Sequence, residues 1–572
     1  DVWAVRVVLA EMAASIEPGY KYTGAVYREI GMQNSNFGGM ENVGNTTITT
    51  NRILPFPQAP DGAFDYLLRV KVHEYYHNLN GSEVTGATPF ELWLNEAVTV
   101  HIEQQYHDFL FGDDYSRLQT VLTLLSPDGG TFYYDRGAAS IPIEPDGFND
   151  PNDLITGVTY VKAPEFVKMI ETIVGKEIFV KGLNLYHTRY RHGNATTRDW
   201  LAAMEEVSGI PLASFAEPWM KKTGFPTLEV ASSYDTGSRT LSITFAKAEG
   251  SEVWDFPFAY AVFGEGGEIL AEDTILLDGT RKTVRHAGIE PPAFLSLNRR
   301  YSFYGKVVHH ASDDELLRQI KEDDDISARY CAYATLLDRE KTRLLAEPDA
   351  PVRDHITSLI PSLLADEGLM TIAGGQFVTI FESVDDETLA HRYRDLYDAR
   401  RKILKATADA HKDALLAAFH AEQGRISGGG TLDAKIADIR HRQAKNAALA
   451  VLAMLDTPDI HDLLTTAFRE SANATDRLTA FALLINSTWE GRLPLLREYM
   501  RTAQEHPVTW EAFLAAVASL GTADATSVVR EVMASDAFSI EQANDQRALL
   551  GRFAQNKKVS LQTPEGRALL LE

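Results

Sequence analysis

The chain has 572 residues, of which 45% are hydrophobic and 24% are charged. This composition is typical of a globular protein and excludes a disordered or fibrous one. The length exceeds what a single hydrophobic core usually serves, so we expect about two to four domains. The net charge of −25 is spread along the chain, and we therefore expect neither a nucleic acid nor a membrane as partner.

The cysteine count indicates the redox compartment of the protein, and the two chain ends indicate whether it is part of a longer protein. Cys331 is the only cysteine, which excludes an intrachain disulfide and favours a reducing compartment. We therefore expect a cytoplasmic protein, and we expect it to be a monomer. The sequence starts at Asp1 without a methionine and ends on ALLLE, a pattern typical of an interrupted helix. We expect this chain to be an internal piece of a longer protein.

Hydrophobic periodicity predicts three regions in a multidomain α+β chain. Residues 1–226 alternate helical stretches such as LLRVKVHEYYHNL with Gly- and Asn-rich loops, which favours an α+β catalytic domain. Residues 227–310 show the period of two expected for short strands, with GEGG at 264–267 as a hairpin signal, and predict a small β-sandwich. Residues 311–572 predict successive amphipathic helices stacked in pairs, although no fixed repeat period supports a named repeat family.

The segment VHEYYHN places two histidines where both could bind one metal ion. On a helix, His73 and His77 lie one turn apart on the same face. A catalytic zinc ion takes three protein ligands and keeps one position for water, so a third donor is required. Glu96 suits this role, because eighteen residues separate it from His77 and its own segment, ELWLNEAVTV, is a second helical pattern. We predict one zinc ion per chain.

Two further glutamates complete the predicted site. Glu74 follows His73 directly and cannot share its ligand direction, which suits it to take a proton from water on the metal. Glu103 lies seven residues after Glu96 on the same helical face and could hydrogen-bond the free ring nitrogen of a ligand histidine. A surface salt bridge is an equal alternative for Glu103. A bare HExxH pattern also arises on solvated helices, and it is the third ligand that favours a metal site.

These motifs together resemble the aminopeptidase N family of gluzincins, and within it the bacterial alanyl type. His73, Glu74, His77 and Glu96 match the family's HExxH-x18-E pattern, and GGMEN at 38–42 matches its GxMEN exopeptidase motif. The resemblance covers the whole chain, including the DDISARYCAYATLL opening of the helical region. It implies a thermolysin-like zinc catalytic domain, a small β-sandwich and a C-terminal α-helical superhelix.

The GGMEN segment implies a substrate with a free N-terminus. In the family, the glutamate that matches Glu41 binds the free α-amino group of the peptide, since a carboxylate near the metal selects a charged N-terminus. The resemblance also assigns substrate binding to Gly38, Gly39 and Met40, with backbone groups of the two glycines aligning the peptide as an added strand. A simpler interpretation of NFGGMENVG is a turn with glycine at positive φ, which does not compete with the functional role. The implied partners are short peptides.

The resemblance assigns the catalytic tyrosine to Tyr160, in GVTYVKAPEF just ahead of a helix. Its phenol would donate to the oxyanion of the tetrahedral intermediate, a contact made mainly in the transition state. From the residues alone, a packed aromatic is the default interpretation of any of the 22 tyrosines. The chain departs from the family in having Ala97 after the third ligand and Ala163-Pro164 after Tyr-Val-Lys, which leaves the donors intact. The family also has a β-domain ahead of this start, which adds a contact to the substrate amine.

Three functions compete at this point. The leading hypothesis is hydrolysis of the first peptide bond of short peptides, with Glu74 as general base and then acid. The second is an epoxide hydrolase and aminopeptidase of the leukotriene type, which shares GGMEN and the zinc ligands but is disfavoured by the predicted sandwich. The third is a non-catalytic scaffold, which the intact ligands argue against. We also expect the helical region to cover the catalytic cleft and restrict entry to small peptides.

Overall fold

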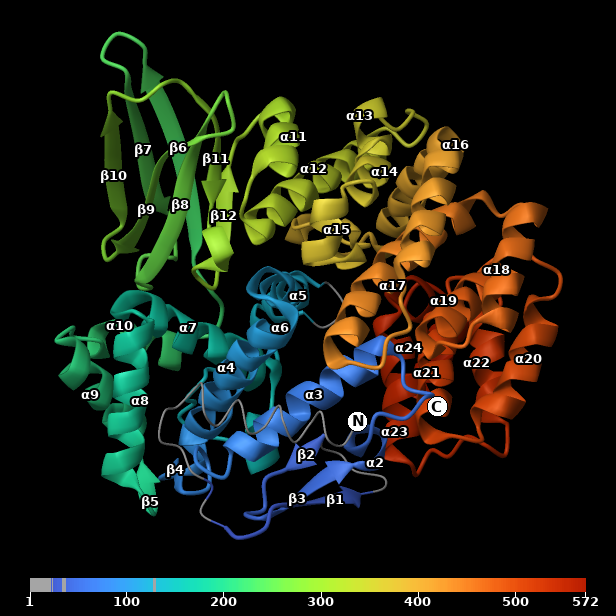
Figure 1. Ribbon diagram of the computed structural model, residues 1–572, viewed down its shortest axis with the longest axis horizontal. Helices are drawn as coiled ribbons and strands as arrows, with labels where there is room; N and C mark the ends of the chain where they lie inside the picture. Colours follow the sequence, from blue (N-terminus) through green and yellow to red (C-terminus); the bar gives the residue numbers. More distant parts are fainter. Residues whose placement is uncertain (1–21, 23, 33–37, 127–129) are drawn as a thin grey trace.

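Three parts follow one another along the chain in the computed structural model, which describes residues 22, 24–32, 38–126 and 130–572 (Figure 1). Helices with short strands come first, longer strands follow, and helices complete the chain. The predicted fold class, a multidomain α+β chain with a large helical C-terminal region, is confirmed. Within the described ranges no single helix is long and apolar enough to cross a membrane, and one bent pair, Asp354–Leu364 and Glu367–Ala373, passes by length and composition.

The first part is built around two long helices, α3 (Asp61–Tyr76) and α4 (Leu92–Phe111), which pack against each other. A sheet with the strand order β1-β3-β2 lies beside α3, below it in Figure 1. Strand β3 pairs in parallel with β1 and antiparallel with β2. The bounds are β1 (Arg28–Met32), β2 (Gly39–Met40), β3 (Asn45–Thr49), α2 (Thr50–Ile53), β4 (Val84–Gly86), η1 (Pro89–Glu91), α5 (Asp113–Leu125), α6 (Thr131–Asp135), η2 (Pro151–Leu154), η3 (Val158–Lys162), α7 (Ala163–Val174), α8 (Lys176–Tyr190), β5 (Gly193–Ala195), α9 (Thr197–Ser208) and α10 (Ala213–Lys221).

Local sequence signals set the start and the end of α4. The short η1 turn ahead of it has a capping box, in which the Phe90 amide donates to the Thr88 hydroxyl at 3.2 Å and the Thr88 amide donates to the Glu91 carboxylate at 2.9 Å. The helix ends at Gly112, whose φ of 83° lies in the region that glycine adopts without strain. The helix therefore presents a defined run of side chains to α3.

The second part is a β-sandwich of two sheets, with the strand orders β10-β7-β6-β12 and β11-β8-β9. The Phe245 ring of the first sheet lies 5.4 Å from the Phe258 ring and 5.3 Å from the Tyr260 ring of the second, so facing aromatic side chains fill the space between the sheets. The predicted hairpin at 264–267 is confirmed, because it joins β8 to its antiparallel partner β9. The bounds are β6 (Thr227–Asp235), β7 (Thr240–Lys247), β8 (Phe256–Gly264), β9 (Ile269–Leu277), β10 (Arg281–Ala287), β11 (Pro292–Leu297), η4 (Arg299–Tyr301) and β12 (Lys306–His309).

The third part is helical and curves along the right-hand side of Figure 1 around the first part. Its long helices contact one another in sequence order, as α11 with α12, α16 with α17 and α18 with α19. The bounds are α11 (Asp313–Glu322), α12 (Ile326–Ala346), α13 (Asp354–Thr357), α14 (Leu359–Leu364), α15 (Glu367–Ala373), η5 (Gly375–Val378), η6 (Glu387–Leu389), α16 (Tyr393–Arg425), α17 (Leu432–Leu452), η7 (Ala453–Leu455), α18 (Pro458–Glu470), α19 (Ala474–Ile485), α20 (Arg492–Ala503), α21 (Pro507–Ala518), α22 (Ala525–Met533), α23 (Ala543–Asp545), η8 (Gln546–Gly551), α24 (Arg552–Gln555), α25 (Lys557–Ser560) and α26 (Pro564–Leu571).

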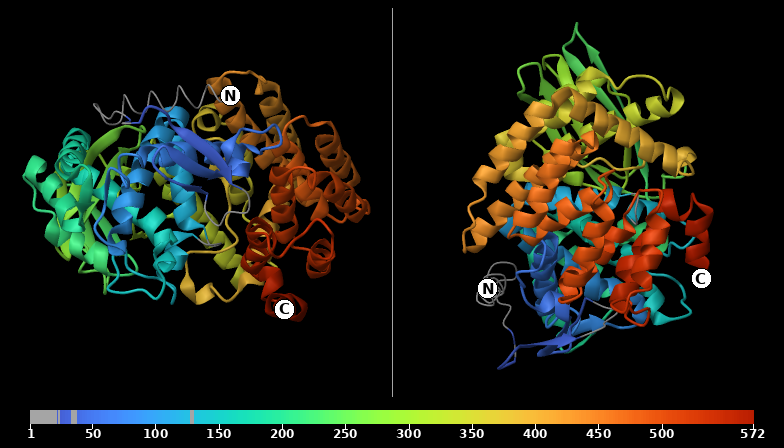
Figure 2. Two further views of the ribbon diagram at one scale, coloured as in Figure 1. Left: turned by 90° about the horizontal axis from the view of Figure 1, so that it is seen from below. Right: turned by 90° about the vertical axis from the view of Figure 1, so that its right-hand side faces the viewer.

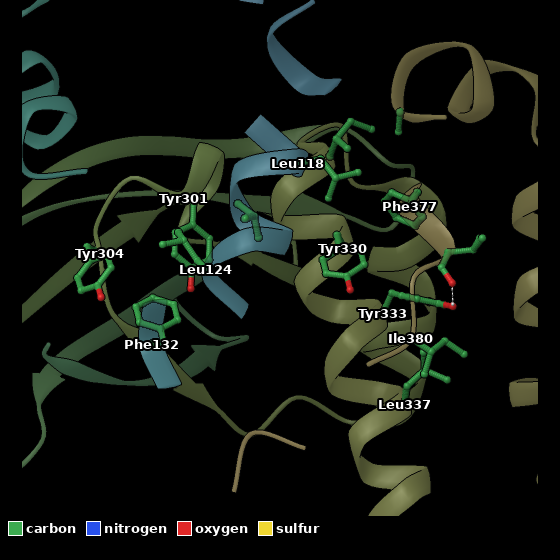
Figure 3. Close-up of a cluster of buried hydrophobic side chains, with 14 of the residues drawn as sticks. Leu118, Leu124, Phe132, Tyr301, Tyr304, Tyr330, Tyr333, Leu337, Phe377 and Ile380 are labelled. Atoms are coloured by element: carbon green, nitrogen blue, oxygen red, sulfur yellow. Dashed lines mark hydrogen bonds between the residues drawn. The ribbon is translucent and has the colours of Figure 1, made fainter. Parts of the chain in front are cut away.

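One continuous hydrophobic core joins the three parts. At their junction, α5 and α6 of the first part meet η4 of the second and α12 of the third, with side chains that include Leu118, Leu124, Phe132, Tyr301, Tyr330, Tyr333 and Leu337 (Figure 3). The buried guanidinium of Arg117 on α5 donates to the Glu165 carboxylate at 2.6 Å and to the carbonyl oxygens of Arg300 and Tyr301 at 2.7 Å. Because this buried charge is fully paired, it fixes the first part to the end of the sandwich.

The helical part also contacts the start of α3. The Arg442 guanidinium on α17 donates to the Asp61 carboxylate at 2.6 and 2.8 Å, and the Asp61 amide donates to the Thr475 hydroxyl at 2.7 Å. The views in Figure 2 show the same neighbourhood, with the orange helices beside the blue α3. The helix that contains both predicted histidine ligands is therefore held at its N-terminal end by the C-terminal part of the chain.

A candidate metal centre with a substrate-binding edge

The three predicted ligands come together between α3 and α4. The Nε2 atoms of His73 and His77 lie 2.9 Å apart. Glu96 Oε2 lies 3.2 Å from the first of these nitrogens and 3.4 Å from the second. All three side chains are buried, and one ligand atom from each lies within 4.8 Å of the others. The group is therefore compact enough to hold one metal ion.

Hydrogen bonds on the far side of each ring orient the lone pairs toward this point. His77 Nδ1 lies 2.8 Å from the carbonyl oxygen of Asn80, which can only accept, so the Nδ1 atom is the protonated one. His73 Nδ1 lies 3.2 Å from the Glu103 carboxylate, and the same reasoning applies. The two Nε2 atoms then lie on the same side, beside the Glu96 carboxylate, where they repel one another unless a proton or a metal ion lies between them. Two imidazoles and one carboxylate are a donor set that suits zinc.

The pKa shifts of the predicted ligands also indicate a site that favours positive charge. Burial alone would raise the pKa of Glu96, but the charge of His77 and the hydrogen bond from His73 outweigh it and lower that pKa. Burial would lower the pKa of His73, but its hydrogen bonds to Glu103 and Glu96 raise the pKa well above the ordinary value. The pocket thus favours positive charge at its centre.

Glu74 lies beside the ligand cluster. Its Oε2 atom is buried and has no hydrogen-bond partner among the described residues, so one carboxylate oxygen is available to a water or a substrate. A Cβ on Gly39 would overlap Glu74 Oε1. Burial raises the pKa of Glu74 to about 7, which suits a general base. The prediction that the segment NFGGMENVG contains a glycine at positive φ is confirmed at Gly44, whose φ is 68°, and Gly38 and Gly39 are not among the positive-φ glycines. A glycine is needed at position 39 because any side chain there would clash with Glu74.

Tyr160 lies on η3, a π-helical turn that runs directly into α7. Its ring stacks on the His73 ring, with the centroids 6.2 Å apart and an angle of 29° between the planes. Burial and the nearby Glu96 carboxylate raise the pKa of Tyr160, so the phenol keeps its proton. The turn is anchored by Lys162, whose buried ammonium lies 2.9 Å from the Asp135 carboxylate and donates to the Gly224 carbonyl at 2.7 Å. Such π turns often occur at functional sites.

The predicted substrate-binding residues lie on an edge strand beside α3. In β2, Gly39 pairs with Ile48 and Met40 with Thr47, and the other edge of β2 has no strand partner within the described part of the chain. Glu41 follows directly and is half-buried, without a hydrogen bond or ion pair to any described residue. Its charge adds to the burial that raises the pKa values of Glu74 and Tyr160, so it lies near the same site.

Sequence reasoning missed Asn80, which fastens the end of α3 to α4. Its side-chain amide donates to the carbonyls of Leu94 and Asn95 at 2.8 and 3.0 Å and to the Thr99 hydroxyl at 3.1 Å. Its side-chain oxygen lies 3.1 Å from His187 Nε2. The sequence signal for this role was an asparagine just after the helix that contains His73, in a segment that is otherwise buried. A buried side-chain amide needs hydrogen-bond partners.

Two ranges of the chain match known families. Residues 7–219 match the Peptidase family M1 domain, and residues 313–569 match a domain of unknown function (DUF3458_C) described as ARM repeats. The second match corrects the interpretation that no named repeat family applies. Helix lengths differ widely, for example 9 residues in α22, 13 in α18 and 33 in α16, and this variation removes a constant period from the sequence.

Comparisons over nearly the whole of this chain agree with these matches. The chain is 24% identical to aminopeptidase N of Escherichia coli over 591 residues, covering 96% of this chain and 65% of that protein. It is 24% identical to aminopeptidase N of Caulobacter vibrioides over 567 residues, covering 96% and 64%. The chain thus spans less than two thirds of the length of these curated relatives.

The fold is also found in a solved structure. The crystal structure of Legionella pneumophila aminopeptidase A in complex with aspartic acid superposes with a TM-score of 0.87 at 20% identity, covering 99% of this chain and 66% of that one. This likeness shows that the arrangement of sheets and helices is shared. Apart from this shared fold, the matched peptidase domain and the similar bacterial proteins support the M1 aminopeptidase N family for this chain.

Proposed function

We propose that this chain is a zinc-dependent aminopeptidase that hydrolyses the N-terminal peptide bond of short peptides. The observation that supports this most is the unpaired carboxylate of Glu41 at the end of the edge strand, facing Glu74 and the three potential ligands. A carboxylate without a partner near a hydrolytic site is suited to bind an ammonium group. A free N-terminus is the ammonium group that every peptide has.

The residues have distinct parts in the proposed reaction. His73, His77 and Glu96 would hold the zinc ion, which supplies a Lewis acid for the peptide carbonyl and lowers the pKa of the attacking water. The free oxygen of Glu74 accepts the proton of that water and later delivers it to the leaving amine. Tyr160 donates its phenolic hydrogen to the oxygen of the reacting carbonyl as negative charge develops there.

Recognition uses the edge strand and the glutamate behind it. Main-chain groups on the open edge of β2 can pair with an extended peptide, which adds a strand to the sheet. Glu41 binds the terminal ammonium group and so fixes which peptide bond lies over Glu74. The reaction removes one residue at a time.

A panel of aminoacyl fluorogenic substrates tests the proposal on the full chain. We expect turnover that disappears with a strong chelator and returns when zinc is added. Turnover that persists in metal-free protein, or that is absent at every zinc concentration, would contradict the proposal. A lipid epoxide in the same assay tests the leukotriene-type alternative, which is not favoured because the similar proteins are named aminopeptidases.

The helical part would restrict access to small peptides. This proposal is supported by two contacts of α17. Arg442 contacts Asp61 at the start of α3, and Arg440 contacts the Phe111 carbonyl at the end of α4, so α17 lies against both helices that contain the predicted ligands. Dipeptides and tripeptides are expected to be cleaved much faster than a folded protein with an accessible N-terminus. Equal rates for both, measured by N-terminal sequencing of the protein, would contradict the restriction.

We also propose a cytoplasmic monomer. The free thiol of Cys331 is compatible with a reducing compartment. Cell fractionation of the source organism and light scattering of the purified chain test these two points. A secreted protein, or a mass of twice the chain mass, would contradict them.

A further inference from the structure

Arg52 lies beside the edge strand. It belongs to the short helix α2 and is half-buried, and its guanidinium carbon lies 4.5 Å from the centroid of the Tyr66 ring. A Cβ placed on Gly38 would lie 3.1 Å from Arg52 Nη1 and 3.2 Å from the Tyr66 hydroxyl. Thr49, next to α2, donates from its amide and its hydroxyl to the Gly38 carbonyl at 3.0 and 3.1 Å. The guanidinium is thus held against the backbone of Gly38.

Arg52 differs from the other cations near this face of α3. Arg69 lies 3.4 Å from the Asp65 carboxylate and 3.5 Å from that of Glu103. Lys71 pairs with Glu29. Arg52 has no carboxylate partner in the part of the chain that the structure describes, although the protein has a net charge of −25. A half-buried guanidinium without a counter-ion is an open site for an anion.

We infer that Arg52 binds a carboxylate of the peptide substrate and gives the site a preference for acidic peptides. The inference rests on the proposed function, in which the peptide lies along β2 with its ammonium group at Glu41. Gly39 packs on Glu74, and Gly38 precedes it by one Cα step of about 3.8 Å. An acidic side chain on the first or the second substrate residue would therefore approach Arg52.

The geometry of Arg52 favours a carboxylate over a neutral amide. The guanidinium carbon lies over the Tyr66 ring, and no N–H group of Arg52 donates a hydrogen bond to a described residue, so these groups are available. Two of these can donate in parallel to the two oxygens of a carboxylate. Asparagine and glutamine offer one accepting oxygen and an amide that only donates, so they lose one of the two bonds and the charge attraction.

Amidated tripeptides test this on the zinc-loaded full chain. One pair has Asp or Asn at the first position, and a second pair has Asp or Asn at the second position. We expect the ratio of kcat/KM for Asp over Asn to be about 10 to 100 in one of the pairs, as for a lost charged hydrogen bond. Arg52→Gln should bring that ratio close to one, and Arg52→Lys, which keeps the charge without the planar fork, should give an intermediate ratio. Arg189→Gln is the matched control, because Arg189 is an exposed arginine whose partner is Glu206 on the surface of α9.

Calorimetry of the same peptides separates this inference from the proposed function. In a Glu74→Gln background, which removes turnover, Asp peptides should bind about 10 to 100 times more tightly than Asn peptides only while Arg52 is present. If no peptide is hydrolysed but this Arg52-dependent difference in binding is found, the proposed function fails and the inference stands. If alanine peptides are hydrolysed but both pairs give ratios near one, or ratios that Arg52→Gln leaves unchanged, the inference is overturned and the proposed function stands.

Discussion

The two helices of the metal site and the edge strand beside them differ in how firmly their functional side chains are held. The ring of His77 is fixed by Asn80, which itself bonds to α4, and the ring of His73 is fixed by Glu103. By contrast β2 has two residues, and the groups around it, Glu41 and Arg52, have no charged partner among the described residues. In the proposed function, the groups that react are therefore oriented in advance, whereas the groups that would bind the substrate are left unpaired.

The largest expected effect concerns the general base. Glu74→Gln should lower kcat by about 10² to 10⁴ while the bound zinc, measured by elemental analysis, stays at one per chain, because the amide keeps the shape but cannot take a proton. If the variant lost its zinc as well, Glu74 would belong to the rigid ligand group, and the division between ligands and base would be wrong.

Tyr160 comes next. Tyr160→Phe should lower kcat by about 10² to 10³ with little change in KM, since the phenol acts mainly in the transition state. Tyr134→Phe is the matched control, because it removes a hydroxyl that bonds to the Ala139 carbonyl away from the site. A rise in KM with kcat unchanged would instead assign Tyr160 to substrate binding.

Glu41→Gln should weaken the binding of the substrate rather than slow the chemical step. We expect kcat/KM for substrates with a free amine to fall by about 10- to 100-fold, mostly through KM, as for the loss of one charged hydrogen bond. The exposed Glu206 provides the control variant Glu206→Gln. An effect on kcat alone would show that Glu41 is part of the preorganised group, and the contrast between the two regions would then fail.

The smallest effect on turnover is expected at Glu103. Glu103→Gln should weaken zinc binding by about 10- to 100-fold, measured by competition with a chelator, with near-normal activity at saturating zinc. Glu171→Gln is the matched control, because Glu171 lies 2.8 Å from His101 in a similar pair that does not include a ligand. Equal zinc affinities for both variants would mean that the bond from Glu103 does not orient His73.

The sequence predicted the metal site better than the surface around it. His73, His77 and Glu96 could be chosen because helical periodicity and the three-ligand rule limit the choices. Tyr160 could be chosen only by resemblance, since nothing in a single sequence predicts a π-helical turn that aims one tyrosine at the ligands.

Other features depend on tertiary contacts that a sequence does not express. The partners of Asn80 come from α4 and from His187, more than a hundred residues away. Arg52 was overlooked because an arginine in a short segment is by default a solvated side chain, and only its position against Gly38 and Tyr66 gives it meaning.

One pair of substrates tests whether Glu41 and the edge strand act together with the metal site. An alanyl substrate with a free amine and its N-acetylated twin are compared at saturating zinc, because the two differ only in the group that Glu41 is proposed to bind. We expect turnover of the free amine and a rate at least about 10-fold lower for the acetylated twin. Equal rates for the two would contradict this expectation, because the metal site would then act without the edge strand and its glutamate.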